Sequence, residues 1–289
     1  MTIELATYEP ADREAYLGLL VEAWGERTMT GDEFDWWFGR NPAGSLISVA
    51  RSDGRIVGVA GHSLAQMVLD GVAQVASFSV HATTHVSARR QGIFAELERK
   101  HEREAAERGV AVVLAFASAS TAPIFLGPLG WTEIGKLRVW ARPLLAQASG
   151  PADGSTFDET ADVASGWVGH VVRDSTYLNW RFVYSPRGYR VVRSESGHAV
   201  VGRTRYRGVE TAVLADFVGG SRDVLRRAVA LSKARAMIAL PGPDERSTFL
   251  SLGFVPAPHT LHLMGKPLAG TLNADVAAWR FTLGDTDFF

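Results

Sequence analysis

The chain has 289 residues, no cysteine, and a net charge of −1 from 30 basic and 31 acidic side chains. The lack of cysteine excludes a disulfide framework, a thiolate nucleophile and a thiolate metal site. The balanced charge argues against nucleic acid as a partner, since such a surface is basic. No apolar run approaches the roughly 20 residues of a membrane span, and Glu4, Glu9 and Asp12 replace the basic start of a signal peptide. We therefore expect a cytoplasmic protein without a membrane partner.

The first half alternates between strand and helix patterns. Asp53-Gly54 and Asp70-Gly71 are typical hairpin turns, and Pro10 suits the first turn of a helix. In chain order, the predicted elements are a strand over residues 2–8, a helix from Pro10 to Trp24, three strands within 46–86, a helix over Ala95–Arg108, and a strand over Val110–Phe116.

The second half follows a stretch of small and polar residues with Gly and Pro, residues 146–160, which is typical of a linker. Strands are predicted within 189–218, a helix capped by Ser221 through Ala234, and a strand over Ala236–Leu240. We therefore predict two domains, 1–147 and 148–289.

An internal repeat connects the two halves. The segment Asp35-Trp36-Trp37-Phe38, with Pro42 and Gly44, matches Asn179-Trp180-Arg181-Phe182, with Pro186 and Gly188, without a gap. Later, Leu129-Gly130-Trp131 is echoed by Leu252-Gly253-Phe254. Such self-similarity indicates one structural unit used twice, although short aromatic turns also match by chance. The repeated aromatic residues either form a wall for an amphipathic ligand or pack in the core.

A possible phosphate site lies where a predicted strand meets a predicted helix. The turn contains Arg89-Arg90-Gln91-Gly92, and the helical pattern begins at Ile93. The first backbone N–H groups of a helix have no intrahelical partner, and the helix dipole adds positive charge there. Because Gly92 has no Cβ, a phosphate can approach these amides closely.

This order of elements resembles the acetyl-CoA-binding core of the GNAT superfamily of N-acyltransferases. In that family a strand, an Arg/Gln-x-x-Gly-x-Gly/Ala turn, a helix, a buried strand and a helix ending near Leu-Gly-Phe follow one another. Here Phe94 replaces the usual small residue, which predicts a bulkier loop. The second half has Phe217-Val-Gly-Gly-Ser-Arg222 instead of the basic turn. The resemblance implies a mixed α/β fold of two tandem GNAT-like units, of which the second is degenerate.

The resemblance also implies where an acyl-CoA co-substrate binds. The pantetheine arm would pair with the strand end Val80-His81-Ala82-Thr83-Thr84, and the Val80 N–H would polarise the thioester carbonyl. The backbone of Arg89, Arg90, Gln91, Gly92, Ile93 and Phe94 would hold the pyrophosphate.

The sequence contains several candidate proton-transfer groups. Leu126 stands where the family has a tyrosine acid, and a thiol of pKa about 8.5 can leave without one. His81 and His85 flank the expected thioester site as candidate base or relay, or as structural histidines. In the tail, Asp285, Asp287 or the terminal carboxylate could act as a base, or the tail could simply pack. No histidine pair or carboxylate cluster has the spacing of a metal site, so no metal is predicted.

The tryptophan-rich segments and the tail resemble a group of bacterial GNAT proteins associated with surface-polysaccharide or natural-product assembly. This resemblance implies transfer of an acyl group, most simply acetyl, to the amine of a small molecule such as an amino sugar or an amino-acid-like metabolite. The alternative is a CoA-responsive binding protein, or another acyl-CoA reaction such as O-acylation or decarboxylation. The acyl length, the acceptor and the oligomeric state do not follow from the sequence.

Overall fold

The computed structural model describes residues 2–25, 28–144, 156–158, 167–195, 197–206 and 208–287. The chain forms two compact units, each assembled from separate segments. Unit 1 contains Met1–Met67, Ala73–Gly135 and His262–Ala274, and unit 2 contains Val68–Val72, Lys136–Leu261 and Asp275–Phe289. The fold is mixed α/β. The two units are interleaved along the chain, whereas the sequence predicted contiguous halves on either side of a linker that lies mostly outside the described residues.

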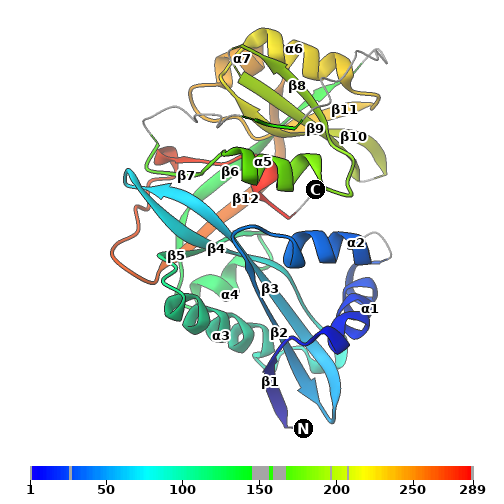
Figure 1. The fold of residues 1–289 in the computed structure, drawn as a ribbon, viewed down its shortest axis with the longest axis vertical. Coiled ribbons are helices and arrows are strands. Elements are labelled where there is room, and N and C mark those ends of the chain that lie inside the picture. Colours follow the sequence, from blue (N-terminus) through cyan, green and yellow to red (C-terminus); the bar gives the residue numbers. More distant parts are fainter. Residues whose placement is uncertain are drawn as a thin grey trace. The chain divides into compact units, whose positions relative to one another are not determined.

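Unit 1 is a sheet with helices on both of its faces (Figure 1). Antiparallel pairing joins β1 to β2 and β2 to β3, whereas β4 and β5 are parallel. Its strands are β1 (Ile3–Thr7), β2 (Ser45–Ser52), β3 (Arg55–Leu69), β4 (Val72–Thr84) and β5 (Val112–Ala117). Its helices are α1 (Arg13–Trp24), α2 (Gly31–Phe34), α3 (Ile93–Glu107) and α4 (Ala122–Leu126).

Local sequence accounts for these elements. The Thr30 hydroxyl accepts a hydrogen bond from the Glu33 amide, and Glu33 bonds back to Thr30, so a capping box starts α2. At the turns between β2, β3 and β4, Asp53-Gly54 and Asp70-Gly71 all have positive φ, as a two-residue hairpin requires. No described helix is long and apolar enough to cross a membrane.

Unit 2 repeats this order of elements. The strands β8, β9 and β10 form an antiparallel meander, and β10 and β11 are parallel with α6 between them in the chain. The bounds are β7 (Gly169–Val171), α5 (Ser175–Leu178), β8 (Arg190–Ser194), β9 (Gly197–Tyr206), β10 (Val209–Val218), α6 (Arg222–Leu231), β11 (Ala236–Ala239), α7 (Arg246–Ser251) and β13 (Trp279–Arg280).

The two units exchange their last strands. The strand β6 (Thr132–Pro143) follows unit 1 in the chain, but its residues Trp140–Pro143 pair with β11 of unit 2. Conversely, β12 (Val255–Pro267) follows the helices of unit 2, and its residues His262–Pro267 pair with β5 of unit 1. Each exchanged strand contributes a buried side chain: Trp140 belongs to the core of unit 2, and Met264 belongs to the core of unit 1.

The repeated aromatic motif has the same local structure in both units. Each copy continues a short helix, α2 or α5, with one π-helical turn, Asp35–Gly39 or Asn179–Val183. In each turn a backbone N–H reaches five residues back, from Arg40 to Asp35 and from Tyr184 to Asn179. Trp36 and Phe182 are buried, so at these two positions the repeat builds core.

Candidate functional site

Strands β4 and β5 of unit 1 pair over a short ladder of three residues each. The parallel ladder joins Ala76–Phe78 to Val112–Leu114 and ends there, although both strands continue. The ring of Phe78, in the last paired position of β4, stacks on the ring of Phe116, with centroids 6.0 Å apart. In parallel sheets, ligands bind at the carboxyl ends of strands that diverge. The segment predicted to hold the pantetheine arm, residues 80–84, is this end of β4.

The backbone of β4 is irregular at His81, which has φ +49° and interrupts the alternation of the strand. The Tyr16 hydroxyl of α1 donates to the His81 carbonyl over 3.2 Å, and the His81 ring lies edge-on to Trp37, 5.1 Å between centroids. A non-glycine residue at positive φ costs free energy and needs surrounding contacts to hold it. The aromatic repeat therefore supports the distortion of β4, and Val80, just before it, is buried.

The start of α3 is an uncapped helix N-terminus. Gly92 is the N-cap with φ +77°, and among the described residues no side chain caps it. Arg90 has φ +64°, and Arg89, Arg90, Gln91 and Gly92 are exposed. The first amides of α3 are thus open to an anion, next to two arginines.

The two residues after Gly92 face away from that turn. Ile93 is buried in the core with Ala50 and Ala60, and the Phe94 ring packs edge-on against Phe125, 5.5 Å between centroids. Because the Phe94 side chain contributes to the core, the bulkier loop expected from Phe94 does not block the amides.

The other predicted residues lie around this turn. Arg89 Nε donates to the Thr84 carbonyl over 3.2 Å, which ties the turn to the end of β4. His85 Nδ1 is 2.7 Å from Ser87 Oγ, and His85 Nε2 is 3.0 Å from Glu22 Oε1, so both ring nitrogens are engaged. Thr83 is buried and Ala82 is half-buried.

In unit 2 the corresponding strand ends are closed. The Arg280 guanidinium donates to the carbonyls of Phe217, on β10, and Leu240, just after β11, and it pairs with Glu245 at 2.7 Å. The Ser221 hydroxyl accepts from the Val224 amide at the start of α6. The Arg280 guanidinium lies between the strand ends, and the Ser221 side chain caps α6. Fewer backbone amides are therefore open to an anion in unit 2 than in unit 1.

The C-terminal tail is part of unit 2's interior. The tail turn η6 (Leu283–Asp285) places Asp285 2.7 Å from Arg173, which also pairs with Asp216 at 3.1 Å. Burial by itself raises the pKa of Asp216, but Arg173 and His198 hold that pKa well below its usual range. Asp285 is thus an ion-pair partner, which opposes its predicted role as a catalytic base.

The tail's backbone is held as well. Arg181 Nε donates to the Gly284 carbonyl over 2.8 Å, and a Cβ on Gly284 would approach the Ala215 carbonyl oxygen to 2.6 Å. We expect deletion of residues 284–289 to lower the melting temperature, because it removes the Asp285 carboxylate from the buried Arg173 and the Gly284 carbonyl from the buried Arg181. A thermal melt checks this expectation. A melting temperature equal to that of the full chain would show that the tail contacts contribute no stability.

Sequence reasoning missed Tyr16 and the Phe78–Phe116 stack. Tyr16 lies in a predicted helix without any motif, and only the fold brings it to His81. A Tyr on the apolar side of a helix with its hydroxyl needing a partner was the available signal.

Residues 4–134 match the family model for an acetyltransferase (GNAT) domain, which covers somewhat less than half of the chain. No curated protein matches the sequence. This part of the chain is therefore similar to GNAT acetyltransferase domains, and the match supports an acyltransferase as the enzyme class.

Solved structures share the fold across most of the chain. N-myristoyltransferase of Saccharomyces cerevisiae with bound myristoyl-CoA has a TM-score of 0.67 at 13% identity, over 91% of this chain and 82% of that chain. A probable N-acyltransferase from Enterococcus faecalis has 0.64 at 11%, over 92% and 72%. A putative acetyltransferase from Pyrococcus horikoshii has 0.63 at 16%, over 95% and 92%. At these identities the likeness concerns the fold alone.

Proposed function

We propose that unit 1 binds an acyl-CoA and that the protein transfers the acyl group to the amine of a small molecule, with acetyl as the simplest group. One observation carries the proposal: the uncapped start of α3, with Arg89 and Arg90 beside it, adjoins the end of β4 where the ladder to β5 has stopped. The backbone amides at the start of α3 would bind a diphosphate, and the part of β4 beyond the ladder would pair with an extended arm.

The geometry supports a binding role for each predicted segment. The amides from Gly92 to Phe94 would hold the pyrophosphate, and Arg89, Arg90 and Gln91 would surround it from the exposed turn. The backbone of residues 80–84 would pair with the pantetheine arm as an added strand. In this proposal the two domains are tandem GNAT-like units. Unit 2 does not bind CoA, because Arg280 lies between its strand ends and Ser221 caps its helix α6.

The transfer reaction needs few side chains. The neutral amine attacks the thioester carbon, a C–N bond forms, the C–S bond breaks, and the amine proton is released as the thiolate takes up a proton. In the proposal the Val80 N–H donates to the carbonyl oxygen as negative charge develops on it. His81 and His85 stay candidate relays. The engaged nitrogens of His85 and the aromatic surroundings of His81 favour positioning roles for both.

The amine acceptor is proposed to be an amino sugar or an amino-acid-like metabolite, on the resemblance of the tryptophan-rich segments to bacterial GNAT proteins of polysaccharide and natural-product assembly. In the structure Trp36 and Trp37 are buried, so they shape β4 rather than form an exposed wall for the acceptor.

Two measurements test the proposed function. Thermal shift with CoA, acetyl-CoA and longer acyl-CoAs should show stabilisation that rises with ligand concentration, as for a ligand that binds only the native state. Thiol release with a panel of amines should then show acyl transfer. Stabilisation without thiol release for any amine or alcohol would favour the CoA-responsive binding protein, and no stabilisation by any CoA species would refute the site.

Substitutions at Leu126, where the family has a tyrosine, test whether a side chain there protonates the leaving thiolate. Leu126 is 45% exposed at the end of α4, so Leu126→Ala loses few contacts, and we expect thiol-release rates near those of the native chain. Loss of a general acid would instead lower the rate about 10²–10⁴-fold. A folded Leu126→Ala variant that binds acyl-CoA but has no activity would contradict this expectation. A strong gain in maximal rate for Leu126→Tyr would show that thiolate protonation limits the reaction.

A further inference from the structure

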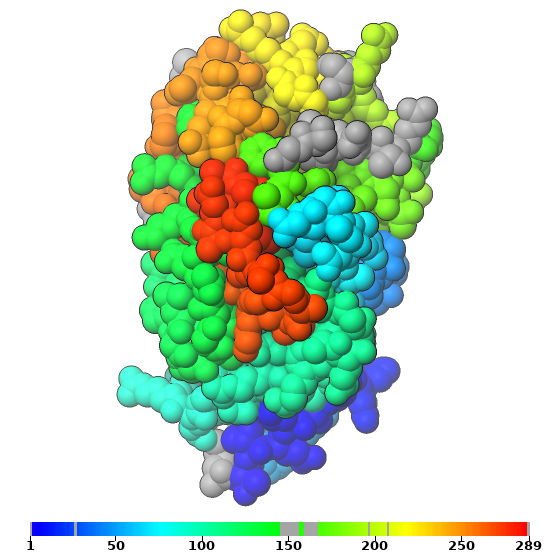
Figure 2. Space-filling model, turned by 90° about the vertical axis from the view of Figure 1, so that its left-hand side faces the viewer, coloured from blue at the N-terminus to red at the C-terminus, as the bar shows by residue number. Residues whose placement is uncertain are grey.

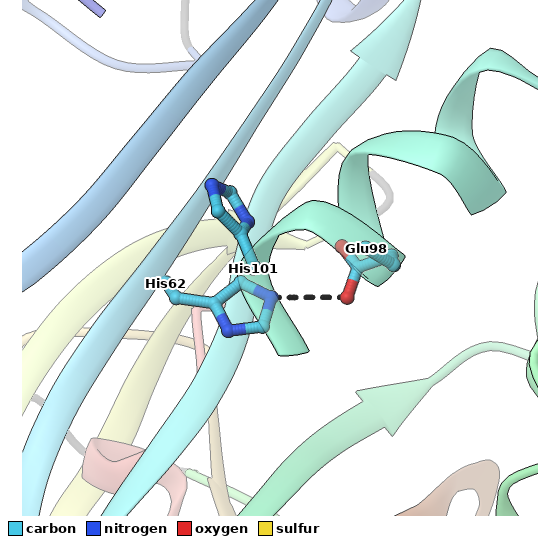
Figure 3. Close-up of side chains that lie close together, drawn as sticks. All are labelled: His62, Glu98 and His101. Atoms are coloured by element: carbon cyan, nitrogen blue, oxygen red, sulfur yellow. Dashed lines mark hydrogen bonds and ion pairs between the residues drawn. The ribbon is translucent and has the colours of Figure 1, made fainter. Parts of the chain in front are cut away.

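A buried cluster in unit 1 takes no part in the proposed reaction. His62 on β3 and Glu98 and His101 on α3 each have 0% of their surface exposed. One possible ligand atom of each lies within 4.8 Å of the others. Figure 3 shows the three side chains converging between the strand and the helix.

The chain supplies this set by simple geometry. Glu98 and His101 are three residues apart on α3, and residues at this spacing lie on one face of a helix. A Glu-x-x-His pair on one helix face is a recurrent way to present two metal ligands. His62 comes from the strand that this face covers, so three ligand side chains converge from two elements.

Hydrogen bonds hold two of the three side chains in place. His62 Nε2 is 3.0 Å from Glu98 Oε2, and His62 Nδ1 is 2.8 Å from Ser77 Oγ. The Ser79 hydroxyl donates to Glu98 Oε1 over 2.9 Å. In metal sites the second ring nitrogen of a ligating histidine is held by such a partner, and ligating carboxylates are hydrogen-bonded as well. Ser77 and Ser79, both on β4, provide these supporting contacts.

His101 is the exception that points to a ligand. Among the described residues neither of its ring nitrogens has a hydrogen-bond partner, although both are buried. Its ring centroid is 4.4 Å from that of His62. A buried imidazole without a hydrogen-bond partner is costly, and a lone pair on one of its ring nitrogens suits a metal ion.

We propose that His62, Glu98 and His101 bind one divalent transition-metal ion. His62 would ligate through Nε2. Its ring proton would then lie on Nδ1 and be donated to Ser77 Oγ, so the change of tautomer releases no proton. Glu98 would ligate through Oε2, and His101 through one of its nitrogens. Two histidines and one carboxylate are a ligand set of zinc and of non-haem iron. The ion compensates the buried carboxylate and joins α3 to β3, behind the strand that carries the acyl site. The proposal does not depend on the acyltransferase activity.

The test measures metal in the untagged full-length protein. After growth with added zinc and iron, elemental analysis should find about one transition-metal ion per chain, and its identity separates zinc from iron. His101→Leu should bring the content below about a tenth of an ion, and a chelator should lower the melting temperature of the native chain but not of this variant. As a matched control, His262→Gln removes a histidine that is 2.7 Å from another glutamate, Glu133, and the metal content should stay unchanged.

A second arm uses Co²⁺ as a probe on chelator-treated protein, where visible absorption bands saturating at one equivalent would report ligand-field binding. The proposal is overturned if the native chain carries no metal and neither Zn²⁺ nor Co²⁺ changes its melting temperature or spectrum. It is equally overturned if His101→Leu retains the metal. If the cluster were only hydrogen-bonded core, His101→Leu would leave stability unchanged or raise it, since the leucine removes unpaired polar atoms.

Discussion

Gly92→Asp is expected to abolish acyl-CoA binding while the protein stays folded. A Cβ on Gly92 meets no atom of the described residues within 4 Å, and aspartate tolerates a positive φ better than most residues, so the fold accepts the change. The new carboxylate stands at the N-cap of α3 and accepts from the amides that the phosphate needs. It also repels the phosphate itself. Isothermal titration should show acetyl-CoA affinity at least about 100-fold lower, a loss of roughly 2.7 kcal/mol.

Two further variants separate the effect of the position of the new side chain from the effect of its charge. Gly220→Asp places the same side chain before α6, at φ +63° and also with no atom within 4 Å of the new Cβ, and its acetyl-CoA affinity should equal that of the native chain. Gly92→Asn has nearly the same shape without the charge, and its loss should be smaller than that of Gly92→Asp. Unchanged affinity in Gly92→Asp, or equal loss in Gly220→Asp, would remove the phosphate site from the start of α3.

The second large effect concerns the interior of unit 2. Arg173→Leu leaves the carboxylates of Asp216 and Asp285 buried without their shared cation, since Arg173 contacts both. Removing one partner of a buried ion pair costs about 3–5 kcal/mol, and here two charges lose it. The Tyr177 hydroxyl, 3.0 Å from Asp285, cannot replace the cation, since it offers one proton and no charge. We expect a fall of at least about 3 kcal/mol in the free energy of unfolding, measured by urea denaturation.

The matched control is an exposed pair in the same unit. Arg226 lies 3.7 Å from Asp223, and both side chains are more than half exposed. Arg226→Leu should change the free energy of unfolding by no more than about 0.5 kcal/mol, since exposed pairs contribute little. A similar effect for both substitutions would mean that the Arg173 network does not carry the stability of unit 2.

Local sequence predicted the elements well. The helix predicted after Gly92 begins at Ile93, the helix predicted from the Ser221 cap begins at Arg222, and the first strand and helix lie where the alternation and Pro10 place them. These features depend on caps, turns and periodicity, which act over a few residues. The π-helical turn after α2 did not follow from the sequence, since its local pattern is that of an ordinary helix.

The site was harder to predict, because its parts are distant in sequence. His81 needs a distorted strand to leave the regular alternation, and the contacts that support the distortion come from Tyr16 and Trp37, on α1 and the turn after α2. The metal-type cluster escaped prediction for the same reason, since His62 lies 36 residues from Glu98. The Glu-x-x-His pair on α3 was not singled out from the sequence, and only the packing of α3 on β3 shows the third ligand.

The exchange of β6 and β12 has a consequence for how the chain folds during synthesis. Unit 1 cannot complete its sheet until residues 262–267 have left the ribosome, because β12 covers the outer edge of β5. Until then β5, with all six residues buried in the finished fold, exposes an apolar edge that could pair with another chain. Contacts of such long sequence separation also slow folding. The nascent protein thus carries an aggregation-prone intermediate from the synthesis of β5 until that of β12, and both units are completed only late, by His262–Ala274 and Asp275–Phe289.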